Sequence, residues 1–182
     1  KDDDSPSTSS STSTSTSTLS TNNFIIIYLH DYTDQGHDVI TTKDECYGTD
    51  SAGWTHAPFY STAAHNLKDR LPSKYHSQPI YSRQGWKVAD NWSDLWDGSI
   101  DSTLYDAEIG SDNFTSGNNY AGWWSATKSD GTYSGQDCNG WTSLSSSDNG
   151  TYGLHSEKDN SSWVNSGTMS CNSEKDVLCF MY

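Results

Sequence analysis

The sequence is poor in aliphatic side chains and in positive charge. Hydrophobic residues fill only 31% of its 182 positions, and Lys and Arg number 10 against 24 Asp and Glu. The formal net charge of −14 repels phosphate backbones and anionic lipid, so we expect no nucleic-acid partner. The longest aliphatic run, residues 24–29, is too short to cross a bilayer, and we expect no membrane insertion.

The common catalytic motifs are missing too. The sequence contains no His-Glu-x-x-His pair, no Gly-x-Ser-x-Gly elbow and no phosphate-binding glycine loop. Its six histidines are scattered, and none stands at a spacing that predicts zinc. We therefore expect a protein that is not an enzyme and has no catalytic residues and no cofactor, with calcium as the one candidate ion.

Acidic and aromatic residues are abundant instead. Aromatic residues make up 13% of the chain and include eight Trp, enough to build a core from large side chains. The densest carboxylate cluster is Asp90, Asp94, Asp97 and Asp101, in a segment that also contains Gly98. Oxygen ligands at such spacing suit Ca²⁺, although a solvated loop with helix-capping aspartates has the same pattern.

The N-terminal segment has a distinct composition. Every position from Ser7 to Thr18 is Ser or Thr, and such a segment cannot offset its ordering entropy by burial. It reads as a flexible linker, as an O-glycosylated stalk, or as an extended strand laid along a neighbouring subunit. We divide the chain into a tail (residues 1–22) and one domain (residues 23–182). The candidate O-glycosylation sites are Ser7, Thr8, Ser9, Ser10, Ser11, Thr12, Ser13, Thr14, Ser15, Thr16, Ser17 and Thr18.

Local patterns predict a mixed α+β domain. Residues 24–32 read as a buried strand because their first half is β-branched and aromatic. Helical patterns occur at residues 42–47 and 57–71, the latter with Ala63, Ala64, Leu67 and Leu71 at helical spacing.

The C-terminal half is rich in loop residues. Short aromatic segments alternate with Gly, Asn, Asp and Ser, and residues 129–131 and 148–150 carry turn signals.

Four cysteines are present, Cys46, Cys138, Cys171 and Cys179, and none forms a Cys-x-x-Cys pair. An even count in this composition predicts two structural disulfides formed in an oxidising, extracellular compartment. Three pairings are open, and free buried thiols are the alternative. Asn-x-Ser/Thr sequons, the candidate N-glycosylation sites, stand at Asn91, Asn113, Asn149 and Asn160.

Several blocks resemble bacterial surface proteins that carry an endostatin-like domain. They are Gly85–Gly98 (GWKVADNWSDLWDG), Cys138–Ser143 (CNGWTS) followed by Gly150, Gly153 and Trp163, and the closing Cys171 with Val177–Phe180 (VLCF). The resemblance implies the C-type-lectin-like fold: a mixed, mostly antiparallel sheet, one or two helices, a long loop region and, here, an extended N-terminal tail.

The resemblance also implies particular residue roles. It pairs Cys46 with Cys179 and Cys138 with Cys171, and it makes Asn91 structural. Trp123 and Trp124 correspond to a central strand, and we expect them in the core rather than in a ligand platform.

Two features depart from that family. The Glu-Pro-Asn, Gln-Pro-Asp and Trp-Asn-Asp triplets of calcium-dependent lectins are missing, so we do not expect calcium-dependent sugar recognition. The sequence starts at Lys1 rather than at a lipidated cysteine, so we do not expect the lipid anchor of that family here.

Two functions fit these observations. The first is an extracellular structural subunit that self-assembles into a glycosylated surface filament or coat through its tail. The second is an adhesin-type binding module for a protein or glycan ligand. Its candidate contacts are the tyrosines Tyr60, Tyr75, Tyr81, Tyr105 and Tyr133.

Overall fold

The computed structural model describes residues 23–30, 46–109 and 122–182. The tail, most of the helical pattern at 42–47 and the Asn113 sequon lie outside these residues. The described part is a sheet-dominated α+β domain with few helices, which is the expected general class. No helix in the described ranges is both long and apolar enough to cross a membrane.

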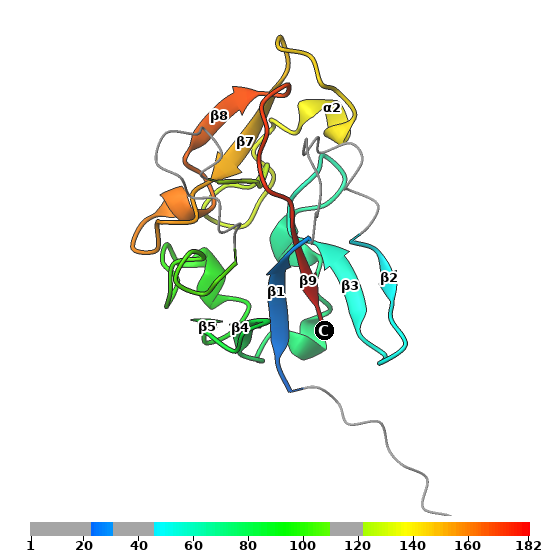
Figure 1. Ribbon diagram of the computed structural model, residues 1–182, viewed down its shortest axis with the longest axis vertical. Coiled ribbons are helices and arrows are strands. Elements are labelled where there is room, and N and C mark those ends of the chain that lie inside the picture. The colour runs from blue at the N-terminus through cyan, green and yellow to red at the C-terminus, as the bar shows by residue number, and fades with distance from the viewer. Residues whose placement is uncertain (1–22, 31–45, 110–121) are drawn as a thin grey trace, which may run out of the picture.

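The larger sheet has six strands in the order β2-β3-β9-β1-β4-β5. Their bounds are β1 Ile25–Leu29, β2 Gly48–Thr49, β3 Thr55–Pro58, β4 Ile80–Ser82, β5 Lys87–Ala89 and β9 Leu178–Met181. Strand β1 pairs with β4 in parallel and with β9 in antiparallel register, so the C-terminal strand lies inside the sheet beside the first strand (Figure 1).

The smaller sheet has three antiparallel strands in the order β6-β7-β8: β6 Trp123–Trp124, β7 Asn149–Gly153 and β8 Gly167–Ser170. In the described parts of the domain, four 3₁₀ turns lie between the strands: η1 Leu67–Asp69, η2 Ser73–Tyr75, η3 Asp94–Trp96 and η4 Ser161–Trp163.

The core is built around aromatic rings, as the composition predicts. Phe59 is fully buried, and its ring centroid lies 5.3 Å from that of Trp123, 6.0 Å from that of Trp92 and 6.1 Å from that of Phe180. A second buried cluster surrounds Trp124 and contains both disulfides. Trp123 and Trp124 are thus core residues on a strand.

The predicted strand at 24–32 is confirmed for residues 25–29. The helical pattern at 57–71 is wrong: its first residues belong to β3, and only Leu67–Asp69 form a short 3₁₀ turn. Leu67 and Leu71 are buried, but Ala63 and Ala64 are exposed, so the apolar stripe of a helix does not form.

Local hydrogen bonds explain that outcome. Thr62 and His65 each donate a main-chain hydrogen bond to the other's carbonyl, which closes a tight turn. The Ser61 hydroxyl then accepts from the main-chain nitrogen of Leu67 at 2.8 Å. A hydroxyl that satisfies a backbone donor competes with helix formation, and propensity alone does not reveal this competition.

One of the two turn signals is confirmed. Gly131 has φ +77°, and Lys128 and Thr132 close a turn around it. The signal at 148–150 is wrong, because Asn149 and Gly150 begin β7. Glycine is needed at position 150 for space, since an added Cβ would lie 2.7 Å from the Trp124 ring and 2.9 Å from the Cys138 sulfur.

The segment labelled α2 (Cys138–Trp141) is a single left-handed turn. Its residues have φ values of 51°, 57°, 67° and 60° in order. Left-handed backbone costs roughly 1–2 kcal/mol per non-glycine residue. The disulfide at Cys138, the buried ring of Trp141 and the Asp137 carboxylate, which accepts from the Gly140 nitrogen at 2.9 Å, hold the turn in place.

Candidate functional site

Two disulfides fix the domain. Cys46 is bonded to Cys179, with 5.5 Å between Cα atoms, and Cys138 to Cys171, with 5.6 Å. This is the pairing that the family resemblance implies. The first bridge ties the segment before β2 to the central strand β9, and the second ties the left-handed turn to the end of β8.

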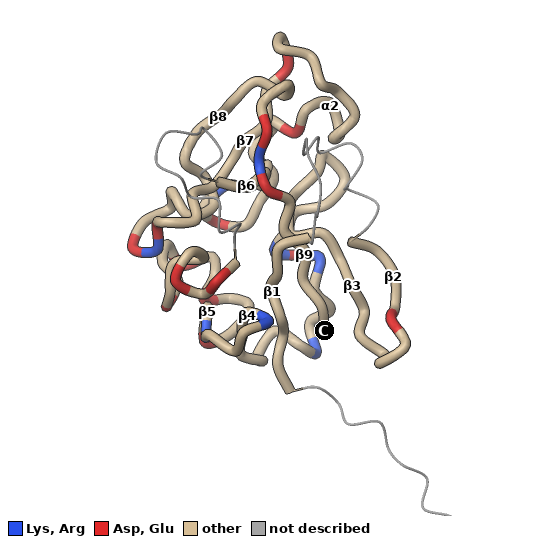
Figure 2. Tube along the Cα trace, in the orientation of Figure 1, with Lys and Arg blue, Asp and Glu red and all other residues tan. Residues whose placement is uncertain are grey.

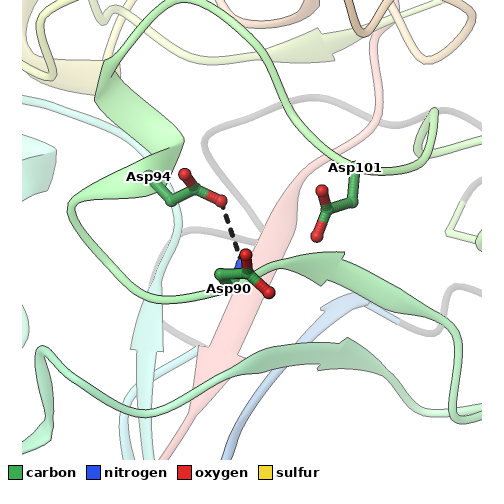
Figure 3. Close-up of side chains that lie close together, drawn as sticks. All are labelled: Asp90, Asp94 and Asp101. Atoms are coloured by element: carbon green, nitrogen blue, oxygen red, sulfur yellow. Dashed lines mark hydrogen bonds between the residues drawn. The ribbon is translucent and has the colours of Figure 1, made fainter.

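Three of the four predicted calcium ligands lie together. Carboxylate oxygens of Asp90, Asp94 and Asp101 fall within 4.8 Å of one another, and Figure 3 shows the three side chains grouped beside β5. Asp97 is not part of this group; its Oδ1 accepts from the main-chain nitrogen of Ser99 at 3.1 Å. Asp94 is also engaged, since its Oδ2 accepts from the main-chain nitrogen of Asp90 at 3.0 Å.

A lysine already neutralises much of this cluster. The ammonium of Lys87 lies 2.5 Å from Asp90 Oδ1 and 2.9 Å from Asp101 Oδ2. Hydrogen bonds to Asp90 and Asp101 raise the pKa of Lys87 well above its ordinary value. The arrangement is an internal ion-pair network, and a calcium ion would have to compete with Lys87 for the same oxygens.

A pocket of about 570 Å³ lies at the β2–β3 end of the larger sheet. This size is typical of small-molecule sites. Its lining residues come from β2 and its preceding residue, from β3, from the turn and 3₁₀ segment at 65–70 and from the C-terminus. They are Tyr47, Gly48, Thr49, Thr55, His56, Ala57, His65, Asp69, Arg70 and Tyr182.

Arg70 is the cation of this pocket. Its Nε donates to the Tyr60 carbonyl at 2.7 Å, and its Nη1 donates to the Tyr47 hydroxyl at 3.4 Å, a long hydrogen bond. Nη2 is buried and has no hydrogen-bond partner among the described residues. Because Nη2 is buried, the donor that Arg70 offers to the pocket is Nη1, whose contact with Tyr47 is exposed and uses one of its two hydrogens.

Other lining groups supply further polar atoms. The Asp69 carboxylate is positioned by Asn66, whose Nδ2 donates to Asp69 Oδ2 at 2.8 Å. His65 is exposed, and Tyr47 is 55% exposed, so its ring offers an open aromatic surface. On another side, the Tyr182 ring contacts the Tyr75 ring at 5.0 Å.

His56, a pocket-lining residue of β3, is hydrogen-bonded to two other segments of the larger sheet. Its Nδ1 and the Tyr28 hydroxyl are hydrogen-bonded at 2.6 Å, and its Nε2 lies 3.2 Å from Asp50 Oδ2. Burial raises the pKa of Tyr28, although the guanidinium of Arg83 over its ring opposes this effect. A raised pKa keeps the Tyr28 hydroxyl protonated, and the hydrogen bonds of this trio tie strands of the sheet together.

Positive charge is concentrated near this part of the fold. Residues 68–87 contain five of the ten basic residues, Lys68, Arg70, Lys74, Arg83 and Lys87, and a single acidic one, Asp69. Figure 2 shows several Lys and Arg positions, in blue, around β4, β5 and β9. The Lys87 ammonium is paired with the aspartate cluster. The Lys74 ammonium lies 4.6 Å from the centroid of the Tyr75 ring, and because that ring contacts Tyr182, Lys74 lies near Tyr182 as well.

The predicted tyrosine contacts have mixed positions. Tyr60 is only 2% exposed and belongs to the core, so its assignment as a contact is wrong. Tyr75, Tyr81 and Tyr133 are half-buried, and Tyr105 is 54% exposed but does not line the pocket. Tyr47, the exposed aromatic that does line it, was missed because it has no distinguishing pattern and lies next to Cys46.

The sequons differ in accessibility. Asn149 is exposed at the start of β7, so it is a strand residue rather than the turn residue that the sequence predicts. Asn160 is exposed and caps η4 by accepting from the Ser162 nitrogen at 2.7 Å. Asn91 is half-buried, and its Oδ1 accepts from the nitrogens of Ser93 and Asp94, a local structural role.

Comparison with protein-family models and with curated proteins found no match for this chain.

Proposed function

We propose that this chain is an extracellular, non-enzymatic binding module of the C-type-lectin-like kind that takes its ligand in the pocket at the β2–β3 end of the sheet. The observation that carries the proposal is the pocket itself, about 570 Å³ in size, with Arg70, Asp69, His65 and the exposed ring of Tyr47 around it. A cavity in which a few polar groups converge beside an aromatic ring is the usual form of a ligand site.

The surrounding structure is suited to that role. The Cys46–Cys179 bridge comes immediately before Tyr47 and anchors it to the central strand β9. The hydrogen bonds of His56 to Tyr28 and Asp50 link β3 to β1, across the intervening β9, and to the turn after β2. Binding groups on such a restrained frame lose little freedom when a ligand enters. The two disulfides also favour an oxidising, extracellular location, where the Ser/Thr-rich tail would present the domain as a glycosylated stalk.

The proposal is tested by screening the full chain for binding to arrays of glycans and extracellular-matrix proteins. The matched variants are Tyr47→Ala, at the pocket, and Tyr105→Ala, which removes an equally exposed ring elsewhere. We expect at least one class of ligand whose binding is lost in Tyr47→Ala and kept in Tyr105→Ala. Binding that both variants retain, or no binding by the wild type, would contradict the proposal.

A structural subunit is the second candidate, and strand β8 favours it. Among the described residues β8 pairs only with β7, and its sequence, Gly-Thr-Met-Ser, is compatible with a further Ser/Thr-rich strand. Addition of an extended segment to such an edge is a known mode of assembly. Sedimentation of the native full chain tests this candidate: concentration-dependent oligomers that disappear after Thr168→Pro would support it, and a monomer at all concentrations would contradict it.

A further inference from the structure

We infer that the pocket at the β2–β3 end of the sheet recognises an acidic saccharide, with the sugar's carboxylate on Arg70 and its ring beside Tyr47. This inference rests on the proposed function and adds the chemical class of the ligand. It follows from the charge, the hydrogen-bonding capacity and the aromatic surface of the lining residues.

Charge favours a ligand with a negative group. The chain carries a net charge of −14, yet Arg70 lines the pocket, and its Nη1 makes one long, exposed hydrogen bond, to Tyr47. A planar carboxylate is the group that a guanidinium binds best. Lys74 adds a second positive charge near Tyr182, which lines the pocket. A ligand with a negative group is therefore favoured over a cationic one.

The pocket also presents groups that accept hydrogen bonds. Asp69 presents a carboxylate whose Oδ2 is held by Asn66, which leaves Oδ1 to accept. Tyr47 and His65 carry groups that can donate or accept. A simple polyanion would be repelled by the Asp69 carboxylate, and it has no hydrogen-bond donors to pair with the acceptors of the pocket. Hydroxyl groups both donate and accept, so a ligand that combines hydroxyls with one acid group satisfies the whole set.

The aromatic ring of Tyr47 suits the face of a sugar ring. The ring of Tyr47 is 55% exposed, and it lies at the pocket rather than in the core. An exposed aromatic face attracts an apolar surface, and the C–H face of a pyranose ring provides one while its edge carries hydroxyls. A uronic acid has this face, these hydroxyls and one carboxylate on a single ring.

The test uses the full, disulfide-bonded chain and three probes. Isothermal titration compares a galacturonic-acid trimer with a galactose trimer, which differs by the carboxylates, and with a tri-aspartate peptide, which lacks the sugar. We expect the galacturonate trimer to bind about tenfold to a hundredfold more tightly than the galactose trimer, the gain typical of charge-assisted hydrogen bonds. Equal affinity for both trimers would overturn the role of Arg70.

Variants locate the site. Tyr47→Ala should weaken galacturonate binding, and Tyr105→Ala, with a ring of the same exposure, should leave it unchanged. Arg70→Gln should remove the preference for galacturonate over galactose. Because Arg70 also binds the Tyr60 carbonyl, its variant could unfold, and Lys74→Ala then tests the charge requirement from an exposed position.

The outcomes separate this inference from the proposed function. Binding of the peptide as tightly as the galacturonate trimer, or galacturonate binding that Tyr47→Ala does not alter, overturns the inference. No binding of either trimer, together with a Tyr47-dependent ligand in the array screen, overturns the inference and leaves the proposed function standing. No Tyr47-dependent ligand of any class overturns both.

Discussion

The imidazole Nε2 of His155 lies 3.6 Å from Oδ2 of Asp176, yet burial keeps the ring neutral. His155 is only 4% exposed, and loss of hydration, with a smaller contribution from the Lys175 ammonium, lowers its pKa to about 4. The neighbouring carboxylate does not offset these two effects, and Nε2 has no hydrogen-bond partner among the described residues.

Stability should therefore fall with acid between pH 6.5 and 4. The unfolded chain protonates His155 near pH 6.5, whereas the folded chain does so near pH 4. Within that window the unfolded state binds more protons, so the free energy of unfolding decreases as pH falls, by about 3 kcal/mol for this group at most.

Urea unfolding of the wild type and of His155→Gln at pH 7 and pH 4.5 measures this contribution. The variant should lose less stability between the two pH values than the wild type does. His65→Gln is the control because the His65 side chain is exposed. Parallel pH profiles for the wild type and His155→Gln would show that His155 is not the titrating group.

Gly131 is needed for close packing and not only for its backbone conformation. An added Cβ there would lie 2.7 Å from the Lys68 Cβ and 2.8 Å from the Trp96 ring. Gly135 has a similar φ of +91° and nothing within 4 Å of its Cβ position. Gly131→Ala should cost about 1–3 kcal/mol more than Gly135→Ala in chemical denaturation, because overpacking adds to the backbone strain that both share. Equal losses of stability in the two variants would contradict the packing requirement, because they would mean that the Trp96 ring moves aside at no cost.

The left-handed turn at Cys138–Trp141 should restrict which residue types position 139 tolerates. Asn139 has φ 57° and an exposed side chain, so a substitution there tests the backbone with little change in packing. Asn139→Gly should be close to neutral, whereas Asn139→Val should cost about 1–2 kcal/mol, since a β-branched residue disfavours this conformation. Thermal unfolding of the two variants side by side gives the difference, and a stable Val variant would contradict the assigned turn.

Lys87 should control any response to calcium. Its ammonium binds Asp90 and Asp101, two of the three grouped carboxylates. Lys87→Gln leaves those carboxylates to repel one another, so the variant should melt at a lower temperature in EDTA and be stabilised by millimolar Ca²⁺ more than the wild type is. If the wild type gains as much from Ca²⁺ as the variant, Lys87 does not occupy the position of the ion.

The sequence predicted the framework better than the site. Runs such as Ile25–Leu29, the buried Trp pair and the turn at Gly131 follow from side-chain type and local conformational preference. The disulfide pairing followed from the resemblance, since spacing alone left three choices.

The pocket could not be predicted because its members are distant in sequence. Tyr47, Arg70 and Tyr182 meet only after β3 pairs with β9 and the expected helix at 57–71 gives way to a turn. The aspartate cluster was predicted as a set of carboxylates, but the sequence did not show that Lys87, on the adjacent strand β5, would neutralise it.

The most direct test of the account is the location of bound ligand on the full chain. Amide NMR shifts recorded during titration with the galacturonic-acid trimer should change most at residues 47–49, 55–57, 65–70 and 182, the residues that line the pocket or adjoin its lining. The largest changes around residues 90–101 or along β8, with the pocket residues unmoved, would contradict the claim that this pocket is the binding site.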